Sequence, residues 1–210
     1  MSPIPTSRRH RTAATLAAAG AVAAGLCWRR FTTPFPYSQR WMLDKELPLL
    51  TRPRLLAELQ PSSGERVLEI GPGTGLFSLP VARALGEAGK LEIFDIQHEM
   101  LDHTMRAAER CGIHNLSATQ GDARRLPYAD ASFDAAYLVT VIGEIPDMAR
   151  ALEELRRVLR PGGRLVVGEF LIDWHGVPLA LLRRRAEHAG LRFERRSGSP
   201  VSYLARFEAV

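Results

Sequence analysis

From residue 66 to the C-terminus, short apolar runs alternate with longer stretches in which apolar residues recur every three or four positions. The first pattern indicates buried strands and the second indicates amphipathic helices. The run "AAYLVTVI" is apolar at nearly every position, which is typical of a parallel strand covered on both faces. Strands are expected at 66–71, 90–95, 115–119, 133–141 and 163–170. Helices are expected at 75–86, 97–111, 147–159 and 177–189.

The C-terminal end breaks this alternation with two extended segments in succession. "LRFERR" and "VSYLARFEAV" are separated by Ser197, Gly198, Ser199 and Pro200, residues that favour a turn. The two segments therefore predict an antiparallel hairpin. The expected fold class is α/β: a Rossmann-like doubly wound sheet, mostly parallel with a C-terminal antiparallel hairpin strand, and with helices on both faces.

The chain divides by composition into three parts, 1–30, 31–60 and 61–210. The first part contains an uncharged stretch, 12–28, which is flanked by arginines and is near the minimum length for crossing a bilayer. A membrane anchor, a cleaved signal peptide and an interfacial arm are all compatible with this stretch. We favour the anchor, with the catalytic domain held on the cytoplasmic side.

The second part, 31–60, opens with two prolines and continues with short amphipathic segments. Trp41, Met42, Leu43 and Leu47 are spaced as on a helix, which predicts a short helix lying on the domain or on a bilayer surface. Packing of these side chains into the core is the alternative. The third part, 61–210, carries the alternating pattern and is the predicted catalytic domain.

The charge of the chain is concentrated in its first part. The net charge is +5, and five arginines without any acidic residue precede Phe31, so the rest of the chain has 23 basic and 23 acidic residues. A neutral body does not favour nucleic acid as a partner. The two cysteines and six histidines form no metal-ligand spacing, so no metal site is expected.

The stretch "VLEIGPGTG" places Gly71, Gly73 and Gly75 immediately after the first expected strand. Glycines there let a ligand approach the backbone beyond the carboxyl ends of a parallel sheet. Their spacing is G-x-G-x-G, which differs from the G-x-G-x-x-G of a dinucleotide site, and no GK[ST] ending of a P-loop follows.

From about Pro53 onward the sequence resembles the class I S-adenosylmethionine-dependent methyltransferases. Four segments carry the resemblance: "VLEIGPGTG", "IFDIQHEML", "GDARRLPYADASFDAAYL" and "ELRRVLRPGGRLVVGEF". The resemblance implies S-adenosylmethionine as cofactor. The implied cofactor-binding residues are Glu69, Gly71, Gly73, Gly75, Asp95, Ile96, Asp122 and Ala123.

Some of these residues have simpler explanations. In the family, an acidic residue at the position of Asp95 holds both ribose hydroxyls. A carboxylate suits this role because it can accept two hydrogen bonds. Asp95 could instead cap the following helix. Asp122 could simply stabilise a turn. Glu69 would be costly to bury unpaired, so we expect it near the polar end of the cofactor.

Methyl transfer needs alignment more than acid–base groups, and a general base matters only where the acceptor must lose a proton. The candidates follow the fourth and fifth expected strands: Glu144 and His175 foremost, with Glu169, Asp173 and Trp174 nearby. A lone histidine in a loop is more often merely solvated.

Two features narrow the acceptor. The nucleic-acid amino-methylating branches of the family carry an Asn/Asp-Pro-Pro-Tyr/Phe motif where this chain reads "VIGEIP". The later segments instead resemble the quinone-biosynthesis and small-molecule branch, which implies a small acceptor. Only residues 171–178 are available for a cover after the fifth expected strand, so the site should be open or covered by the helices around 37–50. A shallow site beside an anchor suits a lipophilic or lipid acceptor. A cofactor-binding subunit without catalysis is the alternative, and a nicotinamide-dependent reductase is a third, disfavoured by the glycine spacing.

Overall fold

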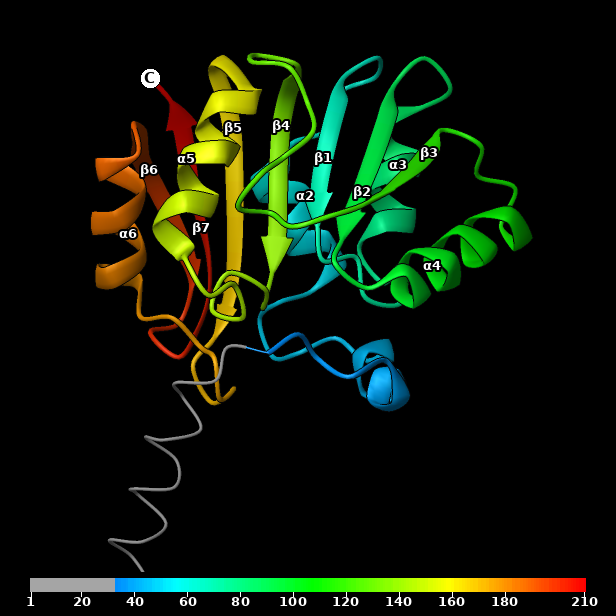
Figure 1. The fold of residues 1–210 in the computed structure, drawn as a ribbon, viewed down its shortest axis with the longest axis horizontal. Helices are drawn as coiled ribbons and strands as arrows, with labels where there is room; N and C mark the ends of the chain where they lie inside the picture. The colour runs from blue at the N-terminus through cyan, green and yellow to red at the C-terminus, as the bar shows by residue number, and fades with distance from the viewer. Residues whose placement is uncertain (1–32) are drawn as a thin grey trace, which may run out of the picture. The chain divides into compact units, whose positions relative to one another are not determined.

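Seven strands form one sheet, in the order β3-β2-β1-β4-β5-β7-β6, within residues 33–210, the part of the chain that the computed structural model describes (Figure 1). The strands are β1 (Arg66–Ile70), β2 (Lys90–Asp95), β3 (Leu116–Gln120), β4 (Phe133–Val139), β5 (Leu159–Phe170), β6 (Leu191–Gly198) and β7 (Ser202–Ala209). The helices are the 3₁₀ helix η1 (Tyr37–Asp44) and the α-helices α2 (Arg52–Leu59), α3 (Ser78–Leu85), α4 (His98–Arg110), α5 (Met148–Val158) and α6 (Leu179–His188).

The sheet changes winding direction at β1. Strands β1 to β5 are parallel, and the chain runs outward from β1 to β3 before it returns to place β4 on the other side of β1. Strand β7 is antiparallel to both β5 and β6. The predicted fold class is confirmed, including the C-terminal antiparallel hairpin.

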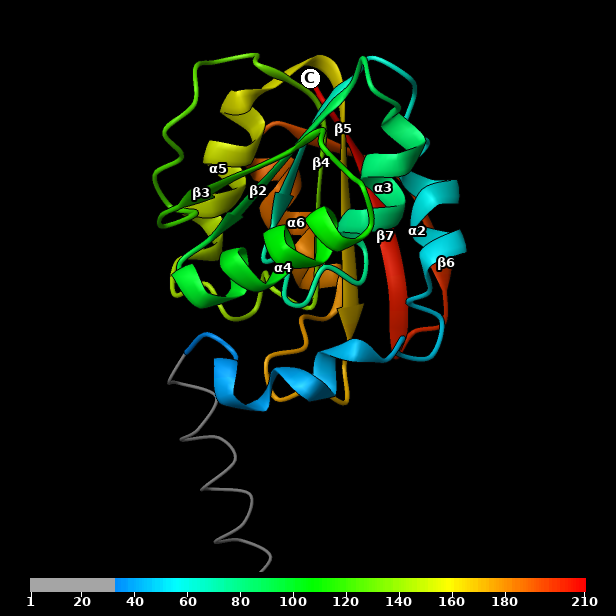
Figure 2. The ribbon, with the colours of Figure 1, turned by 90° about the vertical axis from the view of Figure 1, so that its right-hand side faces the viewer.

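Helices cover both faces of the sheet, as Figure 2 shows with the sheet turned toward its edge. Alternate residues of β1 explain this arrangement, because successive side chains of a strand point to opposite faces. Leu68 and Ile70 belong to the core that includes buried residues of α5 and α6, whereas Val67 belongs to the core that includes those of α2, α3 and α4. Both helix layers bury apolar side chains against the same sheet.

Several elements begin or end at residues that differ from the predicted ones. The helix expected from residue 75 begins at Ser78, because Gly75 has a left-handed φ of +86° that no helix contains. The strand expected at 133–141 ends at Val139, since Thr140 also has a positive φ, of +57°. The strand expected from residue 163 begins earlier, at Leu159.

Helix η1 has no buried residues, whereas Leu47 packs against the core and Leu50 is buried in it. Trp41 and Met42 are 66% and 51% exposed, so the alternative of core packing is wrong for these two side chains. Leu43 lies against the glycine turn, where its Cδ1 atom would be 3.2 Å from a Cβ added to Gly73. No helix between residues 33 and 210 is long and apolar enough to cross a bilayer. The anchor predicted at 12–28 falls outside the described residues and stays a prediction.

Candidate functional site

The carboxyl ends of the five parallel strands lie along one edge of the sheet, the lower edge in Figure 1. The loops that follow β1 and β4 leave this edge on neighbouring strands and lead to helices on opposite faces. Such a point of diverging loops is where open α/β sheets bind ligands. The structure thus brings the residues predicted after β1, β2, β3, β4 and β5 to one edge.

The turn after β1 holds all three predicted glycines in left-handed conformations. Gly71, Gly73 and Gly75 have φ of +72°, +57° and +86°. A Cβ on Gly71 would overlap the Val141 side chain, and the Thr104 hydroxyl donates a hydrogen bond to the Gly73 carbonyl oxygen at 3.1 Å. Only glycine readily combines such torsion angles with such close packing. The turn therefore presents backbone without side chains at the edge.

Glu69 lies beneath this turn. It is 2% exposed, and its carboxylate accepts a hydrogen bond from the Ser78 hydroxyl at 2.5 Å. Burial raises the pKa of Glu69 to about 7, an effect that the Ser78 hydrogen bond partly offsets. Its hydrogen bond joins β1 to the first turn of α3 across the glycine turn.

Asp95 ends β2 and is half-buried at the same edge. Its Oδ1 atom accepts a hydrogen bond from the Gln97 backbone N–H at 2.8 Å. Burial raises the pKa of Asp95 to about 6, against the lowering effect of the Gln97 and Ile96 backbone N–H groups. Gln97, not Asp95, occupies the N-cap position of α4, so the alternative role of Asp95 as that cap is wrong. Ile96 is 51% exposed beside it.

Asp122 and Ala123 follow β3. The Asp122 carboxylate forms an ion pair with Arg124 at 2.6 Å and accepts a hydrogen bond from the Arg124 backbone N–H at 2.9 Å. The Arg124 guanidinium lowers the pKa of Asp122. These contacts support the turn-forming explanation for its side chain, while Ala123 is buried against the core.

The loops after β4 and β5 form the other half of the edge. Glu144 Oε2 accepts a hydrogen bond from the Phe35 backbone N–H at 3.1 Å, and burial raises the pKa of Glu144 to about 8. The His175 backbone carbonyl lies so close to Gly143 that a Cβ there would overlap it. The His175 Nε2 atom is buried and has no hydrogen-bond partner among residues 33–210. The two predicted catalytic candidates therefore come from adjacent loops.

Glu169 supports the second of these loops. It is 1% exposed, and its Oε2 atom accepts a hydrogen bond from the Val177 backbone N–H at 2.8 Å. Burial raises the pKa of Glu169 to about 8, with further raising contributions from Asp173 and Glu144. The carboxyl groups of Glu144, Glu169 and Asp173 thus gather around the carboxyl ends of β4 and β5.

One site contact was not expected from the sequence. Phe35 donates its backbone N–H to Glu144, and its carbonyl oxygen accepts a hydrogen bond from Gln97 Nε2 at 2.9 Å. The residue therefore bridges the ends of β4 and β2. Its position between Pro34 and Pro36 favours extended backbone, but this does not indicate which residues Phe35 would form hydrogen bonds with.

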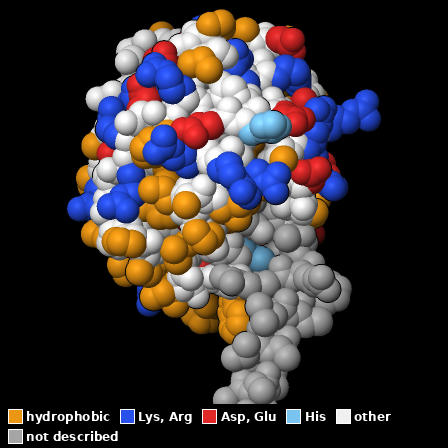
Figure 3. Space-filling view, turned by 90° about the vertical axis from the view of Figure 1, so that its left-hand side faces the viewer, with side chains coloured by type: hydrophobic (Ala, Val, Ile, Leu, Met, Phe, Trp, Pro, Cys, Tyr) orange, Lys and Arg blue, Asp and Glu red, His pale blue; other side chains and the backbone are white. Residues whose placement is uncertain are grey.

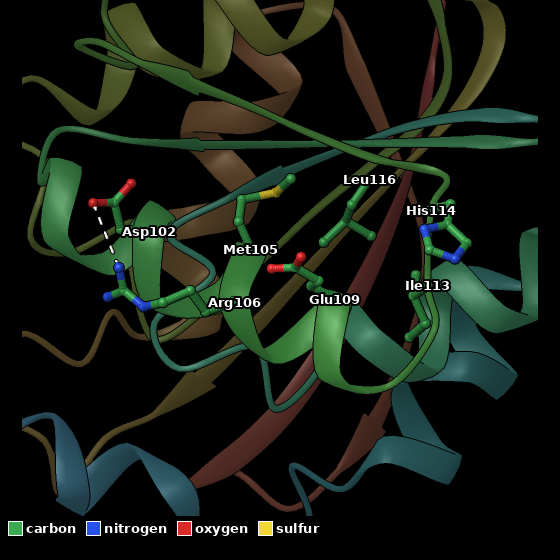
Figure 4. Close-up of a pocket in the computed structure, with 7 residues that line it drawn as sticks. All are labelled: Asp102, Met105, Arg106, Glu109, Ile113, His114 and Leu116. Carbon is green, nitrogen blue, oxygen red and sulfur yellow. Dashed lines mark ion pairs between the residues drawn. The ribbon is translucent and has the colours of Figure 1, made fainter.

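The groove drawn in Figure 4 lies elsewhere, between α4 and the start of β3. Its lining residues are Asp102, Met105, Arg106, Glu109, Ile113, His114 and Leu116. None of them is a predicted site residue, so this groove is separate from the candidate site.

Residues 67–163 match the family described as "Methyltransferase domain". This match covers just under half of the chain. Together with the winding of the sheet and the glycine turn at its edge, it makes residues 67–163 similar to the class I methyltransferases. The predicted resemblance is confirmed, and the alternatives of a non-catalytic subunit and a nicotinamide-dependent reductase are not favoured.

Within this class, the chain is similar to quinone-biosynthesis enzymes. It is 37% identical over 108 residues to the ubiquinone/menaquinone biosynthesis C-methyltransferase UbiE of Haemophilus ducreyi, which covers 51% of this chain and 42% of the relative. It is 32% identical over 115 residues to the demethylmenaquinone methyltransferase of Staphylococcus saprophyticus, with 55% and 48% covered. The aligned part is less than half the length of either relative.

Solved structures show the same fold. A SAM-dependent methyltransferase from Aquifex aeolicus superimposes with a TM-score of 0.77 at 22% identity, covering 84% of this chain and all of that one. The [4+2]-cyclase SpnF superimposes with a TM-score of 0.63 at 25% identity, covering 70% and 57%. Because a protein named for a cyclase reaction has this fold, the fold alone does not determine the reaction.

The geometry of the edge fits S-adenosylmethionine. The three glycines of the turn carry no side chains of their own that would keep a ligand from the backbone, and the Asp95 carboxylate stands at the end of the neighbouring strand. A carboxylate can accept hydrogen bonds from both hydroxyls of a ribose. The roles of the individual residues in holding the cofactor stay predictions.

Proposed function

We propose that this protein transfers a methyl group from S-adenosylmethionine to a small lipophilic acceptor of the quinone type. The observation that carries the proposal is the similarity to the two quinone-biosynthesis methyltransferases over half of the chain. The short loop 171–178 after β5 also supports the proposal. A loop of this length cannot contain an added helix that covers the edge, and an open edge suits a lipophilic acceptor.

In this proposal the two halves of the edge have different tasks. Gly71, Gly73, Gly75 and Asp95 hold the cofactor, with Glu69, Ile96, Asp122 and Ala123 around it. When bound, S-adenosylmethionine supplies a methyl group on a sulfonium. Glu144 and His175 lie on the acceptor side, where a group that accepts a proton activates an acceptor hydroxyl or ring carbon. Alignment and exclusion of water supply most of the remaining catalysis.

The direct test is an assay of methyl transfer from labelled S-adenosylmethionine to demethylated quinols, with water-soluble phenols and amines as comparison acceptors. We expect transfer to the quinols and at most slow transfer to the others. Transfer only to the water-soluble compounds would show that the acceptor class is wrong. Cofactor binding without transfer to any acceptor would favour a non-catalytic role.

Cofactor binding should weaken as the pH falls below 6. The pKa of Asp95 is raised to about 6, so its carboxylate becomes protonated in this range and loses acceptor capacity for the ribose hydroxyls. One linked proton weakens the affinity by at most about tenfold for each pH unit below the pKa. Calorimetric titration across the range measures this, and Asp95→Asn should bind weakly with no such dependence on pH.

Methyl transfer should become faster as the pH rises toward 8. Burial raises the pKa of Glu144 to about 8, and only its ionised form accepts a proton. The Glu144→Gln variant should lose this pH dependence and about a hundredfold or more in kcat. Glu153→Gln, which changes an exposed carboxylate on α5, is the matched control. An unchanged pH profile in Glu144→Gln would remove Glu144 from the mechanism.

We further propose that residues 12–28 anchor a cytoplasmic catalytic domain, 61–210, to the membrane through the linker 31–60. The uncharged sequence with flanking arginines supports this arrangement. Fractionation of cells that express the full chain tests it: recovery of the full chain with the soluble proteins would rule out an anchor.

A further inference from the structure

The edge that carries the candidate site also carries most of the large apolar side chains that residues 33–210 expose. Trp41 and Met42 lie on η1, Ile172 and Trp174 lie in the loop after β5, and Val201 lies in the turn between β6 and β7. We call these five residues the apolar rim. Ile172, Trp41 and Trp174 are 74%, 66% and 64% exposed, respectively, so the chain leaves its two described tryptophans largely in water.

The segments that carry the apolar rim lie along the same edge of the described domain. Figures 1 and 2 both place η1 and the loop 171–178 along the lower boundary of the described residues. The Leu171 backbone N–H donates to the Val201 carbonyl oxygen at 2.7 Å, which ties the loop to the β6–β7 turn. These segments stand on either side of the site rather than in one groove, an arrangement that suits a flat partner better than an inserted peptide.

Basic side chains lie above the rim on the α6 and β6 side. Figure 3 shows hydrophobic side chains gathered low on this face, with Lys and Arg side chains beside and above them. Arg183, Arg192 and Arg195 are paired with carboxylates. Arg184, Arg185 and Arg196, which we call the basic collar, are exposed and have no ion pair within residues 33–210.

Acidic groups also lie at this edge. Burial raises the pKa of Glu144 and of Glu169 to about 8, and Glu46 forms an ion pair with Arg52 at 2.7 Å. Asp173 lies within the loop and accepts a hydrogen bond from the His175 backbone N–H at 3.1 Å, and Asp44 ends η1 next to Lys45. An apolar surface with unpaired arginines next to it matches the two layers of an anionic membrane surface, hydrocarbon below and phosphate above. Tryptophan is the side chain best suited to the boundary between them.

The chain also enters the described domain at this edge. Phe35 hydrogen bonds to Gln97 and Glu144, and it follows by a few residues the uncharged stretch 12–28 and its flanking arginines. The sequence that precedes Phe35 therefore combines apolar and basic residues, as the rim and the collar do.

We propose that the apolar rim and the basic collar dock the catalytic domain onto an anionic lipid surface. The surface of the domain itself makes this contact, in addition to any anchor at 12–28. Docking in this orientation turns the site toward the bilayer, so a lipophilic acceptor reaches it without crossing water. That consequence rests on the proposed function, whereas the docking itself does not.

Tryptophan quenching in the full chain tests the proposal. In a Trp28→Phe background the remaining tryptophans, Trp41 and Trp174, are both on the rim. The probe is a vesicle of phosphatidylcholine and phosphatidylglycerol whose acyl chains carry bromine near the headgroup. We expect quenching of both tryptophans, separated by the Trp41→Phe and Trp174→Phe variants, and about tenfold or more weaker quenching at equal lipid when the collar is changed to serine.

A matched control moves the fluorophore to the opposite edge. Val210 is 60% exposed at the end of the chain, beyond β7 and at the amino end of β5. A chain with Val210→Trp as its only tryptophan should stay unquenched while it is bound to the same vesicles. Neither measurement needs cofactor or turnover, so failure of docking and failure of the proposed function are distinguishable.

Three results would overturn the proposal. Vesicle binding without quenching of Trp41 or Trp174 would leave all membrane contact to residues before 33. Equal quenching of the Val210→Trp control would mean that the docking has no defined face. Concentration-dependent burial of the rim tryptophans without lipid would show that a second copy of the chain covers the rim.

Discussion

Replacing Asp95 by alanine should weaken S-adenosylmethionine binding by about a hundredfold to a thousandfold. Hydrogen bonds to a charged acceptor contribute about 1.5–3 kcal/mol each, and the proposed contact to a ribose uses two of them. Asp95 is the only carboxylate that ends a strand at the glycine side of the described edge, so no neighbour can replace it. Calorimetric titration of the variant and the unchanged chain measures the difference.

The fold of this variant should survive. Burial already raises the pKa of Asp95, which means that the folded chain holds the ionised form at a cost. Removing it should therefore leave the free energy of unfolding nearly unchanged or slightly higher. Asp102→Ala, which removes an exposed carboxylate of α4, is the matched control and should bind the cofactor normally. Equal affinities in the two variants would refute the role proposed for Asp95.

Replacing Gly143 by alanine should lower kcat for methyl transfer by about a hundredfold and leave cofactor affinity nearly unchanged. The added Cβ would overlap the His175 carbonyl oxygen and lie 3.1 Å from Val177 Cγ2. Backbone cannot move aside as a side chain does, so the loop 171–178 must shift away from the loop after β4. A displacement of about 1 Å in a positioned group can reduce a rate by about a hundredfold.

Single-turnover kinetics and calorimetry together check this prediction. Gly64→Ala is the control, because a Cβ at Gly64 meets nothing within 4 Å although its φ is also restrictive, at +86°. That variant should lose stability, by about 1 kcal/mol, without losing activity. If Gly143→Ala weakened cofactor binding as much as transfer, the two halves of the edge would not have the separate tasks proposed for them.

The central strands β1, β2 and β4 were predictable because their residues are buried on both faces. Strand β2 has buried residues at four consecutive positions, and three of them, Leu91, Ile93 and Phe94, are apolar, which indicates a strand at 90–95. The start of α3 was not predictable from apolar spacing, since the three residues before Ser78 belong to a turn whose shape depends on the positive φ of Gly75. Apolar patterns record burial, and they carry little information about torsion angles.

The residues of the site were predictable by position, and their contacts were not. Asp95 and Glu144 follow strands, so a parallel sheet brings them to one edge. The hydrogen bond between Phe35 and Glu144 joins residues 109 positions apart, and it depends on a path across the surface that no local pattern encodes. The burial of Glu169 is likewise a property of the loop folded over it.

The bridge at Phe35 has a thermodynamic consequence. Phe35 donates its N–H to Glu144 and accepts a hydrogen bond from Gln97 at its carbonyl oxygen, so ordering this one residue favours both hydrogen bonds. The entropy lost in ordering this residue is then shared by the ends of β2 and β4. A ligand that strengthens either bond lowers the free-energy cost of forming the other. The two sides of the edge, to which we assign the cofactor and the acceptor, thereby share the backbone of a single residue.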